Sequence, residues 1–486
     1  MVHFPDELWT LIFHQLEFDA RGPDYTDENE PGSEGLAALS RLCRTSSRFL
    51  RLARPFLYRS LPLSNWRLHQ RLLPTLHRNS HLAESVENIT LGEGVFHRDD
   101  IASLLRPYYS ELPLSATPSV FLDTALLIQL AADGEEWPEG TPDIWFAHFA
   151  MLLPNLKSLE YATRSFDTLF PRIISLAANQ GINEPVVDGQ PPPDTVFQET
   201  PFVSQNRRDT AEATRSQLPQ PLAKLEEFRI RNQDTELAVR LKNYQDLFLL
   251  PQLQTFRGWA VELNTRLAAS AQTPRRLSSL RYAHFIDSLA DADGISDLLR
   301  TCPSLQTLEI TWGSSTVGDS TLDFDHIGRV LREHGTGLVE LDLDCLECFS
   351  YEEAEWTGKI GDLRGLQRLK HLSVPEPIML GKEDDLLPSL SNVGDSDEEA
   401  ESPDEDPISE DSLESLLPES LETLRFYSVY DEAEWVRKSV QGVLSSRRLK
   451  HLEEVQLDDC WRFNVKWDKT GWRSKKNSAK LIFYRL

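Results

Sequence analysis

A six-residue hydrophobic pattern recurs along most of the chain. Apolar side chains occupy its first, fourth and sixth positions, and a stretch with helical spacing usually precedes it. The alternation at the last three positions is typical of a strand with one buried face. The occurrences are Val86/Ile89/Leu91, Leu156/Leu159/Tyr161, Leu225/Phe228/Ile230, Leu253/Phe256 with Gly258, Leu277/Leu280/Tyr282, Leu305/Leu308/Ile310, Leu338/Leu341/Leu343, Leu369/Leu372/Val374, Leu421/Leu424/Phe426 and Leu452/Val455/Leu457.

The spacing of this pattern predicts one strand and one helix per repeat. From Leu225 onward, successive occurrences begin 28, 24, 28, 33, 31, 52 and 31 residues apart. Gly335 provides a natural C-cap for one of the intervening helices. The helices expected between strands are Leu237–Leu250, Ile295–Thr301, Ile327–His334 and Trp435–Leu444.

The first sixty residues have a different pattern, which predicts three short helices. Pro5 is suited to the first helical position and is followed by two acids, and an apolar stripe continues from Leu8 to Leu16. A second helix follows the polar stretch Asp19–Gly35, and a third contains Phe49, with Pro55 expected to limit the helix before it. So small a unit buries little surface. Its apolar faces are therefore completed either by a partner or by the rest of the chain.

These helices resemble an F-box of the kind common in fungal proteins. The resemblance rests on three motifs, FPDELWTLIFHQL at residues 4–16, LAALSRLCR at 36–44, and SRF with ARPFLYRSL at 47–49 and 53–61. The family's opening Leu-Pro is Phe4-Pro5 here, and the Asp19–Gly35 insertion replaces a usually tight connection.

The resemblance implies an apolar surface that binds a Skp-type adaptor and, through it, a cullin and a RING subunit. Leu11 and Phe49 are expected to pack inside the bundle instead. For each proposed contact residue, packing within the chain is the alternative. The adaptor-binding residues implied by position are Pro5, Leu8, Ile12, Leu16, Leu36, Leu39, Leu42 and Cys43.

The remaining repeats resemble an irregular leucine-rich repeat domain. The expected fold class is α/β, a three-helix F-box followed by a solenoid with parallel strands on the concave face and helices outside. An ordinary α/β domain with leucine-rich strands is the alternative. The expected boundaries are 1–61 for the F-box, 62–85 for a helical connector and 86–486 for the repeats, with flexible insertions at about 185–221 and 384–413.

Charge then limits the partners. With 50 Lys and Arg against 77 Asp and Glu, the formal net charge is −27, which argues against nucleic acid and anionic membranes as ligands. No signal peptide or membrane-spanning run is visible, so we expect a protein of the cytoplasm or nucleus.

The 25 residues from Arg462 onward carry a net positive charge, unlike the chain as a whole. Because Arg462–Trp467 and Ala479–Leu486 alternate like strands, an end-cap for the repeats is expected there.

A second charged stretch, Asp395–Asp411, contains ten acids. Its serines resemble sites of acid-directed kinases, and an unmodified, solvated loop is the alternative.

The repeat register predicts a target-binding surface. The residue between the second and third anchors faces away from the core in each strand, and in adjacent repeats this column contains Arg229, Arg257 and Arg281. Arg231 and Trp259 are neighbouring outward positions. Guanidinium groups suit carboxylate and phosphate, so we expect an acidic or phosphorylated target there, with the chain's own acidic stretch as a resting occupant. Local pairing with Glu226, Glu227 and Glu309 is the alternative.

No catalytic constellation is visible. Nucleotide loops, nucleophile elbows and metal-binding histidine pairs are missing from the sequence, and Cys345 and Cys348 form a lone C-x-x-C that we interpret as core. We therefore expect a non-enzymatic, cofactor-free receptor subunit of a cullin–RING ubiquitin ligase. One rival is a repeat scaffold whose helices do not engage a ligase, and another is an enzyme with a dispersed site.

Overall fold

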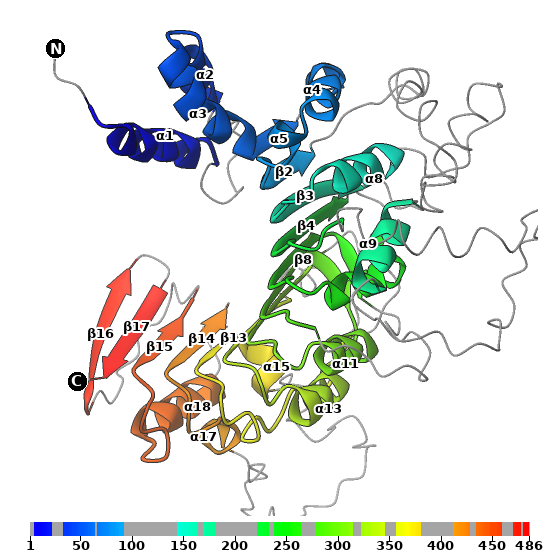
Figure 1. The fold of residues 1–486 in the computed structure, drawn as a ribbon. Coiled ribbons are helices and arrows are strands. Elements are labelled where there is room, and N and C mark those ends of the chain that lie inside the picture. Colours follow the sequence, from blue (N-terminus) through cyan, green and yellow to red (C-terminus); the bar gives the residue numbers. More distant parts are fainter. Residues whose placement is uncertain are drawn as a thin grey trace, which may run out of the picture. The chain divides into compact units, whose positions relative to one another are not determined.

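The computed structural model is a mixed α/β structure built mainly from parallel strands (Figure 1). It divides into two compact units, residues 1–233 with 249–253, and residues 234–248 with 254–486. None of the described helices is long and apolar enough to cross a membrane. The residues described are 4–21, 33–63, 66–91, 143–163, 169–179, 221–232, 238–263, 278–313, 322–345, 356–380, 412–427, 434–458, 470–477 and 480–485.

Three helices open the first unit, as predicted. They are α1 (Asp6–Arg21), α2 (Ser33–Cys43) and α3 (Ser47–Arg59). Their core consists of Phe13, Leu39, Ala53 and Phe56, which come from all three helices. Burial of this shared apolar surface holds the helices together.

Two expectations about these helices were wrong. Pro55 does not limit a helix but lies inside α3, flanked by the core residues Ala53 and Phe56. Burial of these neighbours offsets the backbone hydrogen bond that proline cannot make. The predicted insertion is also shorter, because α1 continues to Arg21 and α2 begins at Ser33. Residues 22–32 lie outside the described residues.

The strands of the first unit are parallel and follow chain order. β1 (Ser60–Leu63) pairs with β2 (Asn88–Leu91), which pairs with β3 (Ser158–Thr163), which pairs with β4 (Glu227–Asn232). β1 was not predicted as a strand, and it begins immediately after α3. The helices that accompany these strands are α4 (Trp66–Arg78), α5 (Ser80–Ala83), α8 (Asp143–Leu152) and α9 (Leu169–Asn179).

In the second unit, seven parallel strands are followed by an antiparallel pair. The antiparallel β17 pairs with β15 on one side and with β16 on the other. In sheet order the strands are β6 (Thr255–Trp259), β8 (Tyr282–Ala290), β9 (Thr307–Trp312), β11 (Glu340–Asp344), β13 (His371–Pro375), β14 (Thr423–Tyr427), β15 (Glu454–Leu457), β17 (Lys480–Arg485) and β16 (Trp472–Asn477). Shorter strands are β5 (Val239–Arg240), β7 (Val261–Leu263), β10 (Leu322–Asp323) and β12 (Trp356–Thr357).

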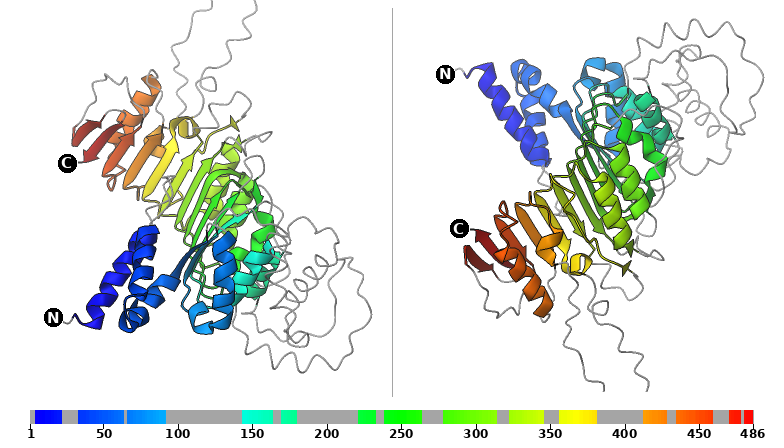
Figure 2. Two further views of the ribbon diagram at one scale, coloured as in Figure 1. Left: turned by 90° about the horizontal axis from the view of Figure 1, so that it is seen from above. Right: turned by 90° about the horizontal axis from the view of Figure 1, so that it is seen from below.

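The helices of the second unit cover one face of its strands, as both views of Figure 2 show. The other face carries the alternate, more polar side chains. Leu237–Leu250 was predicted as an ordinary helix, but its described part forms the short strand β5 followed by the 3-10 helix η2 (Leu241–Leu249). The remaining helices are α11 (Ala292–Thr301), α13 (Phe324–His334), α15 (Glu376–Leu380), α17 (Leu413–Leu416) and α18 (Glu434–Ser445).

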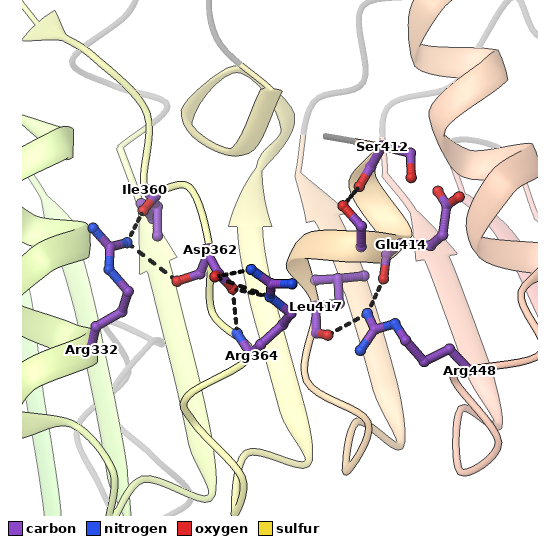
Figure 3. Close-up of polar contacts among 9 residues, drawn as sticks. Arg332, Ile360, Asp362, Arg364, Ser412, Glu414, Leu417 and Arg448 are labelled. Atoms are coloured by element: carbon purple, nitrogen blue, oxygen red, sulfur yellow. Dashed lines mark hydrogen bonds and ion pairs between the residues drawn. The ribbon is translucent and has the colours of Figure 1, made fainter. Parts of the chain in front are cut away.

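Side-chain hydrogen bonds to backbone carbonyls tie these helices to neighbouring segments (Figure 3). Arg332 of α13 donates to the carbonyl oxygens of Ile360 and Asp362, at 2.9 and 3.2 Å. Arg448, just after α18, donates to the carbonyl oxygens of Glu414 and Leu417 and so fixes α17 beside α18. These contacts give the four backbone carbonyl groups side-chain donors.

Nine of the ten predicted strand positions are confirmed, and one is out of register. The strand expected at Leu277/Leu280/Tyr282 is β8, whose buried alternation contains Ala283 and Phe285. Tyr282 lies on the opposite, more polar face. The error arose because Tyr282 was counted as apolar while the small Ala283 was not.

The two predicted insertions fall almost entirely in residues 180–220 and 381–411, outside the described part of the chain. The C-terminal alternation at Ala479–Leu486 corresponds to β17, whereas Arg462–Trp467 is outside the description. β16 was not predicted.

Candidate functional site

Helix α1 carries apolar side chains on a buried face and on an adjoining exposed face. Phe13 is fully buried, and Trp9 and Leu16 pack against the core of the bundle. Leu8, Leu11 and Ile12 are turned outward, with exposed fractions of 43%, 67% and 42%. Leu11 and Ile12 follow Leu8 by three and four residues, so the three lie on one side of the helix. Clustered exposed apolar side chains of this kind mark interaction surfaces.

The predicted adaptor-binding residues divide between this surface and the core. Leu8 and Ile12 are exposed on α1, and Pro5 is exposed just before this helix begins. Leu39 is fully buried, so it is not available to a partner in this structure. The part-buried remainder packs against the core cluster and comprises Leu16, Leu36, Leu42 and Cys43.

The expectation for Leu11 was wrong, and that for Phe49 is confirmed. Leu11 is the most exposed of the large apolar residues described. Phe49 packs in the bundle, with its ring 4.8 Å from that of Trp9 in an edge-on arrangement. Leu11 is two positions from both Trp9 and Phe13, so it lies on the other side of the helix from these two rings. Assigning all the apolar residues of the segment to one stripe hid this difference.

Asp6 fixes the start of α1 against α3. Its carboxylate accepts from Nε and Nη2 of Arg48, at 2.8 and 2.6 Å, and from Arg51 at 3.1 Å. Arg48 also donates to the carbonyl oxygen of Phe4 at 2.7 Å. These bonds set the orientation of the outward face of α1 relative to α3.

The predicted column of outward-facing residues is present on the strands, except that one of its positions is occupied by a different residue from the one expected. In the first unit Thr90, Glu160 and Arg229 occupy adjacent registered positions. Arg281 is not in the column but precedes β8, where it is exposed, and His284 takes its place. In the second unit the column is Arg257, His284, Glu309, Asp342, Ser373, Arg425 and Gln456.

The predicted arginines do not form a free anion-binding ladder. Nε of Arg229 lies 2.8 Å from Glu227 of the same strand, which is the local pairing that we considered as an alternative. Arg231 is close enough to Glu160 to oppose the burial that raises the pKa of that carboxyl. Arg257 lies over the Tyr282 ring at 5.4 Å. Trp259, two residues after Arg257 on β6, is half-buried.

The middle of the second unit's column is a network of tyrosine, histidine and carboxylate groups. The Tyr282 hydroxyl donates to Glu309 at 2.8 Å, and Nδ1 of His284 lies 3.1 Å from the same carboxylate. Burial raises the pKa of Glu309, although the Tyr282 hydrogen bond opposes the shift. The carboxylate is thus held by its neighbours on β8.

A second network lies toward β15. Tyr427 donates to Asp342, and Arg425 donates through Nε and Nη2 to Asp458, at 2.9 and 2.6 Å. Burial raises the pKa of Asp342 to about 6. Sequence reasoning missed Tyr427 and Asp458, although each directly follows the last anchor of its repeat and therefore faces outward at the strand end.

Cys345, the half of the C-x-x-C that the structure describes, matches its interpretation as a core residue. Cys302 and Cys345 are buried, and burial raises the pKa of the Cys302 thiol to about 12. Cys348, the other half of the C-x-x-C, lies outside the described residues.

No family model matches the chain, and no curated protein is significantly similar to it.

Proposed function

We propose that this chain is the substrate-recognition subunit of a cullin–RING ubiquitin ligase. The N-terminal helices would bind a Skp-type adaptor, and the repeat strands would hold a target protein. The mechanism is proximity, because holding the target raises its effective concentration at the ubiquitin-charged partner. The chain would contribute binding energy and no bond-making group.

The observation that supports this proposal is the exposed apolar face of α1. A three-helix bundle with a complete core has no internal need for Leu8, Leu11 and Ile12 to be apolar. These side chains belong to the segment whose sequence resembles an F-box. A partner helix or groove with apolar side chains would remove them from water.

A different observation favours the scaffold alternative. Helix α3 ends at Arg59 and β1 begins at Ser60, so the bundle continues directly into the sheet of the first unit. Such a bundle could serve as the cap that repeat arrays need at their ends.

Co-purification with a Skp-type adaptor separates the two possibilities. Full-length wild type should retain the adaptor, and the Leu8→Asp/Ile12→Asp variant should lose it while remaining folded, because both side chains are already exposed. Tyr484→Asp is a matched control, since Tyr484 is an exposed apolar residue of the other unit.

The possible results lead to different conclusions. Retention by wild type and by the control, with loss in the double variant, would support adaptor binding through α1. A folded wild type that fails to bind would leave the scaffold function.

A further inference from the structure

The antiparallel strands β16 and β17 concentrate positive charge in a strongly acidic protein. Their twelve residues include five basic side chains and no acidic one, in a chain of net charge −27. The basic residues are Arg473, Lys475, Lys476, Lys480 and Arg485.

Arg485 and Lys480 contact named groups elsewhere in the structure. Arg485 donates to the carbonyl oxygens of Leu449, Lys450 and Leu452, which anchors β17 to the turn after α18. Lys480 lies 3.6 Å from Asp458, which Arg425 also contacts.

Arg473 and Lys475 are in a different situation. Both are exposed, and neither forms an ion pair or side-chain hydrogen bond with any residue that the structure describes. They are two residues apart on β16 and therefore point to the same face. Across the pair, Arg473 is opposite Tyr484 and Lys475 is opposite Ile482. The face thus combines two cations with an exposed aromatic ring.

β16 also has an unpaired edge. Within the described part of the chain it pairs only with β17, and Figure 1 shows it as the last strand beside β17. An edge strand offers backbone N–H and C=O groups to an added strand. Lysines on such an edge usually prevent pairing with another copy of the protein. An acidic strand would neutralise them instead of being repelled.

We propose that β16 binds an extended acidic segment of a target protein, which adds as a strand and pairs its carboxylates with Arg473 and Lys475. This inference rests on the proposed function and specifies its substrate class. Arg229 and Arg257 have local partners. The proposal therefore assigns acidic recognition to Arg473 and Lys475, which pair with no residue that the structure describes. Arginine and lysine at strand spacing match carboxylates at every second position of the added strand.

A fluorescent ten-residue peptide of alternating Glu and Val tests the proposal with the full-length chain. Its affinity should fall at least about tenfold in Arg473→Glu/Lys475→Glu and decline with added salt. Arg447→Glu/Lys450→Glu is the matched control, because it makes the same charge change at exposed residues just after α18. The control should bind within about twofold of wild type.

The chain's own stretch 395–411 is a competing occupant, so the titration is repeated with its ten acids changed to Asn or Gln. The proposal is supported if this neutralised chain binds the peptide and if adding Arg473→Glu/Lys475→Glu to it abolishes binding. No binding by either parent chain would overturn the proposal. The lysines of β16 would then serve only to prevent this edge from pairing with another copy of the protein.

Two further results would also overturn it. One is equal loss in the control pair, and the other is equal binding of a peptide with Lys in place of Glu. Hydrogen exchange should in addition slow at residues 472–477 in the complex, and an unchanged rate there would exclude strand addition. Adaptor co-purification is independent of all these results, so failure here would leave the proposed ligase function standing.

Discussion

The Tyr427 hydroxyl on β14 reaches across β13 and lies 2.7 Å from each carboxylate oxygen of Asp342 on β11, to which it donates its one proton. The side chain that shares the register of Asp342 on the intervening strand is the small Ser373. This hydrogen bond therefore links two residues that are 85 positions apart in sequence and belong to different repeats.

Tyr427→Phe should destabilise the second unit by about 1.5–3 kcal/mol, because the hydrogen bond is made to a buried carboxylate. Urea unfolding followed by tryptophan fluorescence measures the change. Tyr484→Phe is the control, since Tyr484 is exposed, and it should have almost no effect. Equal unfolding midpoints for Tyr427→Phe and wild type would show that solvent replaces the bond.

Asp342 should make stability depend on pH. Its folded pKa of about 6 exceeds its ordinary value of 3.8, chiefly because of burial. Between about pH 4 and pH 6 the folded state therefore holds a proton that the unfolded state has lost. The stability associated with this carboxyl is present below pH 4 and is lost as the pH rises through 6.

Asp342→Asn should remove that dependence. Between pH 4 and pH 7, the unfolding free energy of wild type should fall by up to about 3 kcal/mol relative to that of Asp342→Asn. Urea titrations at four pH values across this window provide the test. Parallel curves for the two proteins would contradict the raised pKa.

Leu39→Ala should destabilise the helical bundle by about 2–5 kcal/mol, because Leu39 is fully buried in its core. Leu11→Ala, at a residue that is 67% exposed, should change stability by no more than about 0.5 kcal/mol. Hydrogen exchange of α1, α2 and α3 measures both. A large loss at Leu11 would place that side chain in the interior after all.

Gly328→Ala should destabilise the second unit by about 1–3 kcal/mol. Gly328 lies in α13, and an added Cβ would overlap the carbonyl oxygen of Ile360, the same group that accepts from Arg332. Because the overlapping atom belongs to the backbone, the segment around Ile360 must shift. The shift weakens the hydrogen bond from Arg332 to the Ile360 carbonyl.

Gly365→Ala is the matched control, since an added Cβ there has nothing within 4 Å. Thermal unfolding compares the two variants. Similar midpoints for both would mean that α13 moves away at little cost.

The sequence by itself determined the repeat and most of its register. Leu308, Leu341 and Leu372 were placed correctly because period-two alternation about a buried anchor is a local property of each strand. The N-terminal helices were also predicted from a local pattern. In the first of them it is the helical spacing of Leu8, Ile12 and Leu16.

Only the tertiary structure decided which outward side chains have partners. Arg229 pairs within its own strand and Arg425 pairs with Asp458, whereas Arg473 is left exposed on a strand that the sequence did not predict. Leu39 is buried and Leu11 is exposed, but the sequence shows a leucine at both positions and does not distinguish them. Local periodicity sets which face a residue is on, but burial and ion pairing depend on what the folded chain places opposite that face.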